Sequence, residues 1–118
     1  MEEKRRFVRY LSRLEAAYAL LIEAPDNERV EQTETVNLSR GGCTLVMSRS
    51  ERPGTRLAVH LALPSGAEVT IQGRIAWIRE PLAGMAGAMG VYFDESQPMP
   101  EGYVALLEDA ERRGARSD

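Results

Sequence analysis

The sequence has few of the residues that build metal sites and nucleophilic catalytic sites. It holds one cysteine, Cys43, and one histidine, His60, far apart in the chain. A structural zinc site needs about four such ligands, and a Cys/His nucleophile needs both residues as a pair. No pair of carboxylates has an evident acid-base arrangement either. We therefore expect neither an enzyme nor a metal or cofactor site, a buried Cys43 among apolar neighbours, and a structural or surface role for His60.

Long apolar runs and secretion signals are also missing. No segment approaches the roughly 20 apolar residues that a membrane span requires. The charged N-terminus lacks the apolar stretch of a signal peptide, and a single cysteine cannot form an internal disulfide. The phosphate-binding patterns GxxxxGK[ST] and GxGxxG do not occur. These absences favour a cytoplasmic protein without membrane insertion.

Positive charge is scarce in most of the chain and concentrated at its start. The net charge is −3, yet five of the 15 Lys and Arg residues lie near the N-terminus. They are Lys4, Arg5, Arg6, Arg9 and Arg13. Nucleic-acid binding usually involves a broad basic face, so this basic arm on an acidic body suits a small, highly charged ligand better than DNA.

The remaining chain has the pattern of one small β-rich domain. The 118 residues, 43% of them hydrophobic, are typical of a single compact domain. Alternation and turn residues predict strands at 30–38, 43–48, 56–63, 68–79 and 89–93, and helical spacing predicts a helix at 101–113. This order favours a small antiparallel barrel or sandwich whose open end or edge is covered by the helix. The polar strand 30–38 is expected near an edge, and Gly73 within strand 68–79 predicts a bulge or bend.

The first segment allows two interpretations. Apolar residues recur near helical spacing through residues 3–24, and several alanines favour a helix there. The alternative is an arm followed by a buried strand around residues 16–24, which Pro25-Asp26-Asn27 would end. The pattern by itself leaves both open.

Two short motifs carry most of the chemistry. The first is Arg5-x-x-x-Arg9 with Arg6 between them. Arginine binds phosphate through its planar fork of donors and stacks on flat rings. Taken alone, this motif is more simply explained as a solvated arm or helix face.

The second motif is Asn37-x-Ser39-x-x-Gly42, where a strand runs into a glycine turn. The Asn37 amide can pair with the edge of a base, and the Ser39 hydroxyl can bind a phosphate or a base. Gly41 and Gly42 allow a positive φ, and Gly42 also allows close approach of the backbone to a ligand. Taken alone, this motif is more simply explained as a β-turn.

Together, the two motifs resemble the signatures of the PilZ domain family, bacterial receptors for the second messenger cyclic di-GMP. Those signatures are RxxxR and, roughly 20–30 residues later, [DN]xSxxG, and both are intact here. Residues 73–79, Gly-Arg-Ile-Ala-Trp-Ile-Arg, and residues 90–93, Gly-Val-Tyr-Phe, are similar to two later strands of the family. The resemblance extends over about residues 4–113.

The resemblance implies a mainly β fold, a six-stranded antiparallel β-barrel with a flexible N-terminal arm and a C-terminal α-helix. Residues 1–118 would form a single domain with the arm at 1–14, the barrel at about 15–95 and the helix at about 100–113. Residues 17–22 would then be the first strand, which favours the strand interpretation of that segment.

The resemblance also implies a function, that of a cyclic di-GMP receptor whose arm changes conformation on binding and which signals through a protein partner that the sequence does not identify. The implied ligand-binding residues are Arg5, Arg6, Arg9, Asn37, Ser39 and Gly42. Trp77 has two interpretations, packing in the core or stacking on a guanine. The roles of Lys4 and Arg40 stay unassigned. The alternative function is a PilZ module that binds no nucleotide and acts only through protein contacts in motility or pilus machinery.

Overall fold

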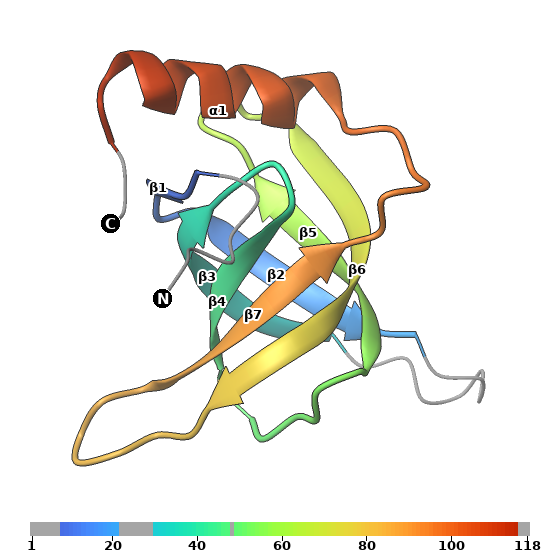
Figure 1. Ribbon diagram of the computed structural model, residues 1–118, viewed down its shortest axis with the longest axis vertical. Coiled ribbons are helices and arrows are strands. Elements are labelled where there is room, and N and C mark those ends of the chain that lie inside the picture. Colours follow the sequence, from blue (N-terminus) through green and yellow to red (C-terminus); the bar gives the residue numbers. More distant parts are fainter. Residues whose placement is uncertain (1–7, 22–29, 48, 116–118) are drawn as a thin grey trace, which may run out of the picture.

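The structure is a computed structural model that describes residues 8–21, 30–47 and 49–115. Its elements are β1 (Tyr10–Leu11), β2 (Glu15–Leu20), β3 (Val30–Leu38), β4 (Gly42–Met47), β5 (Arg56–Ala62), β6 (Glu68–Arg79), β7 (Gly87–Phe93) and α1 (Glu101–Arg112). The strands form a barrel, and α1 lies across one of its ends (Figure 1). The predicted strands agree with β3 to β7 to within two residues at each end.

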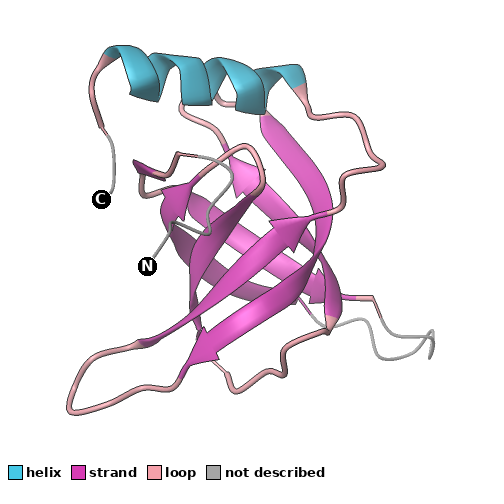
Figure 2. Cartoon of the chain, viewed as in Figure 1, coloured by secondary structure: helices cyan, strands magenta, loops and turns pink. Residues whose placement is uncertain are grey.

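The barrel is closed and entirely antiparallel. Strands β2 to β7 are hydrogen-bonded in the order β3-β2-β5-β6-β7-β4, and a further pairing of β3 with β4 joins the two ends of that order (Figure 2). This confirms the predicted six-stranded antiparallel barrel with a C-terminal helix. The expectation that strand 30–38 lies near an edge is wrong, because β3 pairs with β2 on one side and β4 on the other. Closure leaves no open edge among these six strands. The polar side chains of β3 are therefore explained by their position on the outer face of the barrel and not by an edge.

Alternating side chains fill the interior. Leu57, Val59 and Leu61 of β5 are buried, and Ile71 and Ile75 of β6 are buried across from them. The helix closes the end of this core with the buried side chains of Tyr103, Leu107 and Ala110. The helical spacing of the sequence therefore identified the face that covers the open end of the barrel.

The segment with two interpretations is a strand where the structure describes it. Residues 15–20 form β2, paired with β3 and β5, so the helical interpretation of residues 3–24 is wrong for this part. The apolar spacing was misleading because residues that alternate on a strand can also coincide with helical positions over a few residues. Ile22 and the residues up to 29 lie outside the described residues.

The chain ahead of β2 is attached to the barrel through Thr35. The backbone N–H of Leu14 donates to the buried Thr35 hydroxyl at 2.8 Å, and that hydroxyl donates to the Ser12 carbonyl at 2.6 Å. Tyr10 and Leu14 are both buried in the core cluster. Residues 8–14 therefore differ from the flexible arm expected at 1–14, since pairing of β1 with β3 and burial of these two side chains hold them in place. Residues 1–7 lie outside the described part of the chain.

Gly73 lies at a close approach of two strands. A Cβ at this position would overlap the carbonyl oxygen of Tyr92 on β7. The register shift of β6 against β7 comes later, between Ile75 and Trp77. The bulge that was expected at Gly73 therefore occurs on the same strand but two to four residues later.

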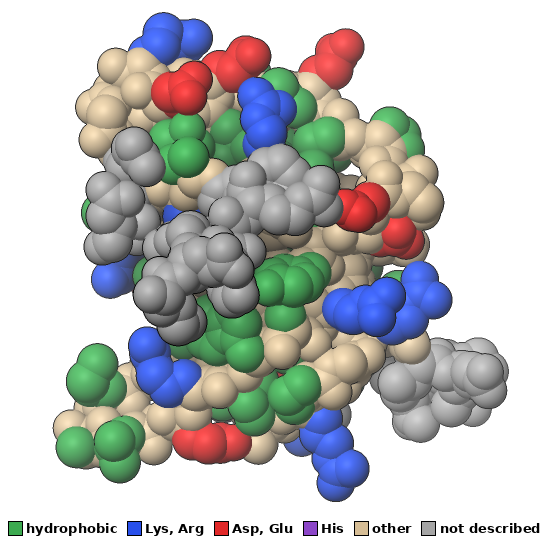
Figure 3. All heavy atoms as spheres, in the orientation of Figure 1, with side chains coloured by type: hydrophobic (Ala, Val, Ile, Leu, Met, Phe, Trp, Pro, Cys, Tyr) green, Lys and Arg blue, Asp and Glu red, His purple; other side chains and the backbone are tan. Residues whose placement is uncertain are grey.

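The loop from β6 to β7 projects from the opposite end of the barrel from α1 (Figure 1). Leu82 and Met85 pair across its tip, and their side chains are 77% and 65% exposed. Figure 3 shows the hydrophobic side chains gathered at this projection. The tip lies away from the pocket described next, whose lining does not include either residue.

Candidate functional site

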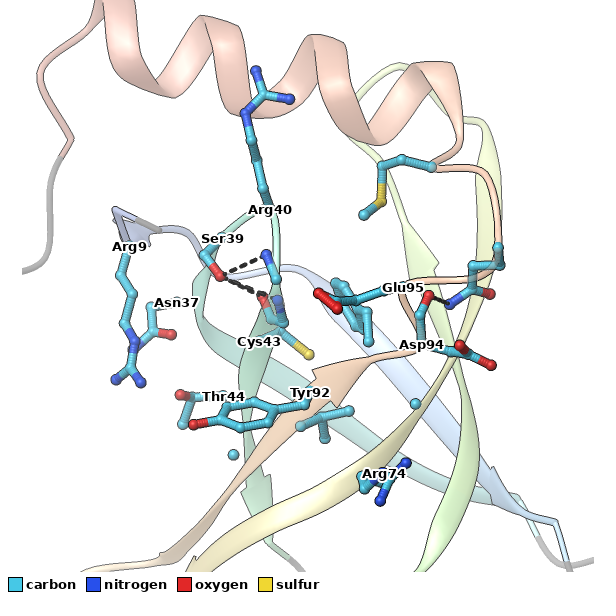
Figure 4. A pocket seen from close by; sticks show the side chains of 18 of the residues that line it. Arg9, Asn37, Ser39, Arg40, Cys43, Thr44, Arg74, Tyr92, Asp94 and Glu95 are labelled. Carbon is cyan, nitrogen blue, oxygen red and sulfur yellow. Dashed lines mark hydrogen bonds between the residues drawn. The ribbon is translucent and has the colours of Figure 1, made fainter. Parts of the chain in front are cut away.

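Strand β1 places Arg9 beside the second motif. Tyr10 is paired with Leu38 and Leu11 with Asn37, so Arg9 directly precedes a pair at the end of β3. The other side of β1 is tied to the end of α1, because the Leu11 N–H donates to the Ala115 carbonyl at 2.7 Å. Figure 4 shows the guanidinium of Arg9 next to the amide of Asn37.

The turn after β3 is held by its own serine. The Ser39 hydroxyl accepts hydrogen bonds from the backbone N–H groups of Gly41 and Gly42 at 3.2 and 3.1 Å, and it donates to the Gly42 carbonyl at 3.2 Å (Figure 4). The Ser39 N–H donates to the same carbonyl at 2.9 Å. Ser39 is buried, so its hydroxyl fixes the turn.

Gly42 is needed by the neighbouring strand. A Cβ there would overlap the carbonyl oxygen of Val91, a backbone atom of β7. The positive φ expected at Gly41 or Gly42 is absent, since the glycines with positive φ in the described residues are Gly54, Gly66, Gly84 and Gly114. The second motif therefore uses its glycine for strand packing.

Helix α1 supports the turn from inside the barrel. The hydroxyl of Tyr103 donates to the Ser39 carbonyl at 2.7 Å, and its ring meets Phe93 edge to face with centroids 5.7 Å apart. Burial raises the pKa of Tyr103 well above its usual value. Cys43 is buried, as predicted, and this burial raises the pKa of its thiol to about 12.

One pocket collects the predicted site residues that the structure describes. Its volume is about 990 Å³, at the upper end of the range of about 300–1,000 Å³ for ligand sites. Its lining includes the predicted residues Arg9, Asn37, Ser39, Gly42 and Trp77. Arg5, Arg6 and Lys4 lie outside the described residues, so their roles stay predictions.

Two of these side chains have unused hydrogen-bonding groups. Neither Arg9 nor Asn37 has a side-chain hydrogen bond or ion pair with any described residue. Both are half-buried, and both line the pocket. A cationic fork and an amide therefore meet at the pocket wall with their donors and acceptors available to a ligand.

The two remaining candidates differ in their surroundings. The ring of Trp77 packs on Gly90, where a Cβ would overlap it, and Trp77 also lines the pocket. Trp77 is half-buried and is not part of the buried core cluster, so its packing is against Gly90 and not in the core, and stacking on a guanine stays a prediction. The side chain of Arg40 is exposed and in Figure 4 extends toward α1, away from Arg9 and Asn37.

Several pocket residues were missed by sequence reasoning. They are Thr44, Arg56, Arg74, Tyr92, Asp94 and Glu95, among others. Arg74 and Tyr92 belong to the two later strands that resemble the family. In each strand they alternate with the apolar residues. Because successive side chains of a strand point to opposite faces, this alternation places both on the outer face of the barrel. It is the signal in the sequence that could have identified them.

The described residues lack a group of three or more His, Cys, Asp or Glu side chains that could hold a metal ion. His60 lies on the outer face of β5, where its Nδ1 pairs with the Thr70 hydroxyl at 2.8 Å. In the described part of the chain there is no helix with the length and apolar character to cross a membrane.

Solved structures show the same fold at low sequence identity. The Bacillus subtilis inhibitor of motility, MotI/DgrA, matches with a TM-score of 0.74 and 19% identity over 96% of this chain and 52% of its own. The PilZ domain of YcgR from Escherichia coli, solved with c-di-GMP, matches with a TM-score of 0.67 and 14% identity over 95% of both chains. The K. pneumonia MrkH–c-di-GMP complex matches with a TM-score of 0.64 and 16% identity over 96% of this chain and 57% of its own. The chain thus spans about half of the length of MotI and of MrkH.

No curated protein sequence matches the chain. The sequence model of the PilZ domain matches residues 3–108. This match covers both motifs, all of the barrel strands and most of α1. The chain therefore belongs to the PilZ domain family.

Proposed function

We propose that this protein is a receptor for cyclic di-GMP that has no catalytic activity of its own. The observation that carries the proposal is the meeting of Arg9 and Asn37, both without partners among the described residues, in one pocket of about 990 Å³. Membership of the PilZ family supports it. So does the fold shared with the YcgR domain and MrkH, which were solved with c-di-GMP.

The ligand chemistry suits these residues. Cyclic di-GMP carries two phosphates and two guanines. In the proposal, Arg9 binds a phosphate or a guanine edge together with Arg5 and Arg6 from the arm, since arginine matches both acceptors. Asn37 pairs with a guanine edge, and Trp77 provides an aromatic face beside it. Ser39 and Gly42 hold the turn that positions Asn37.

The proposed response is a change of the N-terminal arm. Arg5 and Arg6 repel one another as long as no anion is present, and the bound ligand would fix the arm against the barrel. In the proposal, the surface so formed binds a downstream protein in the cytoplasm. This order change belongs to a common class of switches.

Calorimetric titration with cyclic di-GMP tests the proposal. Arg9→Ala should weaken binding about tenfold or more, because a charge-assisted hydrogen bond contributes about 1.5–3 kcal/mol, and Arg5→Ala should do the same. Arg13→Ala is the matched control, since Arg13 lies on the same segment but pairs with Glu34 at 3.0 Å and does not line the pocket.

Two results would overturn the proposal. The first is no binding by the unmodified protein, which would favour the interaction module that binds no nucleotide. The second is unchanged affinity in both Arg5→Ala and Arg9→Ala.

A further inference from the structure

A continuous row of side chains crosses the outer wall of the barrel from the second motif. Gly42 on β4 is paired with Tyr92 on β7, Tyr92 with Arg74 on β6, and Arg74 with Arg56 on β5. Directly opposed residues point to the same face of a sheet, and neighbouring strands lie about 4.8 Å apart. The row therefore extends about 14 Å from the turn, over three strand spacings. All four residues line the pocket that holds Arg9 and Asn37.

The two arginines of this row face one another with no ion-pair partner. Arg56 and Arg74 are both exposed, and like charges directly opposed across strands destabilise a sheet. Neither has an ion pair within 4.0 Å among the described residues. Figure 3 shows Lys and Arg side chains gathered on one side of the barrel wall. A bound anion would offset the repulsion that the fold leaves in place.

Asp94, an acidic side chain close enough to feel the charges of these arginines, is already engaged in hydrogen bonds. The Asp94 carboxylate accepts hydrogen bonds from the backbone N–H and the hydroxyl of Ser96 at 3.0 and 2.8 Å. These bonds are the main cause that lowers the pKa of Asp94, and the charges of Arg56 and Arg74 lower it further. Asp94 thus influences the arginines at longer range without forming an ion pair with either.

Tyr92 adds an aromatic surface between the arginines and the motif. Its side chain is 60% exposed, although a large aromatic side chain gains stability when it is buried. Figure 4 shows its ring lying across the pocket, with Thr44 on one side and Arg74 on the other. A purine can stack on such a ring and gain about 1–3 kcal/mol.

We propose that Arg56, Arg74 and Tyr92 form a second contact region for the nucleotide, in which the two arginines bind a phosphate and the ring of Tyr92 stacks on a guanine. This inference rests on the proposed function and names residues that neither motif contains. It accounts for three features together, namely the unpaired arginine pair, the exposed ring and the extension of the pocket along the wall. The ligand is thereby held from two sides, by Arg9 and Asn37 on one and by the wall on the other.

The test is a calorimetric titration of the full chain with cyclic di-GMP, using variants of the row. Arg74→Ala and Tyr92→Ala should each weaken binding about tenfold, and Arg56→Ala should weaken it about threefold or more because it lies furthest from the motif. Tyr92→Phe keeps the ring and should bind at least about threefold more tightly than Tyr92→Ala. Arg79→Ala is the matched control, since Arg79 is an exposed arginine on the same strand that does not line the pocket.

The outcomes separate this inference from the function on which it rests. Binding by the unmodified protein, loss with Arg9→Ala, and affinities of Arg56→Ala, Arg74→Ala and Tyr92→Ala equal to that of Arg79→Ala would overturn the inference and leave the function standing. No binding by the unmodified protein would overturn both. Thermal unfolding of each variant checks folding, and Arg74→Gln, which keeps a polar side chain on the outer face, replaces Arg74→Ala where that variant does not fold.

Discussion

The turn at residues 39–42 and the side chains of Arg9 and Asn37 beside it use their polar groups in opposite ways. In the turn, the Ser39 hydroxyl is committed to three backbone groups, and Gly42 lies against the backbone of β7. Beside the turn, Arg9 and Asn37 have no side-chain partner among the described residues. The contrast holds within a single motif, because Asn37 is separated from Ser39 by one residue.

This comparison teaches that the second motif combines two tasks. Ser39 and Gly42 build a rigid support, since their interactions are satisfied inside the protein. Asn37 and Arg9 have the groups that remain to bind a ligand. Substitutions in the support should therefore lower stability, and substitutions in the binding groups should lower affinity at nearly constant stability.

Gly42→Ala should have the largest effect and should act on stability. The added Cβ would overlap the Val91 carbonyl oxygen, and a backbone atom within a closed barrel cannot move aside as a side-chain end can. Forced overpacking costs about 1–3 kcal/mol or more, so we expect a fall of about 10 °C in the melting temperature. Thermal unfolding followed by circular dichroism measures this.

Gly102→Ala is the control for this variant. A Cβ at Gly102 meets the end of the Leu63 side chain, which can adjust, and alanine favours the helix. Its melting temperature should stay within about 3 °C of that of the unmodified protein. A Gly42→Ala variant that melts normally but loses cyclic di-GMP affinity would reverse the assignment, because the glycine would then serve the ligand.

Ser39→Ala and Asn37→Ala should behave in opposite ways although they are neighbours in one motif. Removing the Ser39 hydroxyl leaves the N–H groups of Gly41 and Gly42 without their acceptor, which costs about 1–3 kcal/mol of unfolding free energy. Removing the Asn37 amide breaks no bond with a described residue but should weaken cyclic di-GMP binding about tenfold.

Denaturant unfolding and calorimetric titration of both variants measure these two quantities. Arg13→Ala serves again as a control for a polar side chain outside the pocket. The comparison fails if Asn37→Ala is the less stable of the two, or if Ser39→Ala loses affinity with no loss of stability.

The sequence predicted most of the barrel because its strands alternate in a regular way. The bounds of β3 and β6 match their predictions, since side-chain parity and flanking turn residues are local signals. Strand β1 was missed because two residues, Tyr10 and Leu11, carry no pattern, and their strand character depends on Leu38 and Asn37. The bulge near Ile75 was misplaced because a register shift depends on the partner strand.

The candidate site was predictable only in part for a related reason. The resemblance brought Arg9 and Asn37 together, and the structure places both in one pocket. Ser39 holds the turn, whereas the amide of Asn37 is left to bind a ligand. This difference depends on hydrogen bonds in the folded structure that a sequence motif does not contain. Arg56, Arg74 and Tyr92 lie on three strands, and only the register of the barrel shows that they form a row.

Tyr103→Phe should have the smallest effect and tests how far the support extends. The Tyr103 hydroxyl is fully buried and donates to the Ser39 carbonyl at 2.7 Å, so its loss should lower the unfolding free energy by about 1 kcal/mol. The ring stays packed against Phe93, and the Ser39 hydroxyl still holds the turn. Affinity for cyclic di-GMP should therefore change by less than about threefold.

Tyr92→Phe is the matched control for stability, since it removes an exposed hydroxyl from the other side of the same turn. Denaturant unfolding should show a loss for Tyr103→Phe and none for Tyr92→Phe. A large loss of affinity in Tyr103→Phe at nearly unchanged stability would mean that the turn depends on α1 to keep Asn37 in place. The boundary between support and binding groups would then have to include the helix, because the hydroxyl of Tyr103 would be setting the geometry of the pocket from inside the barrel.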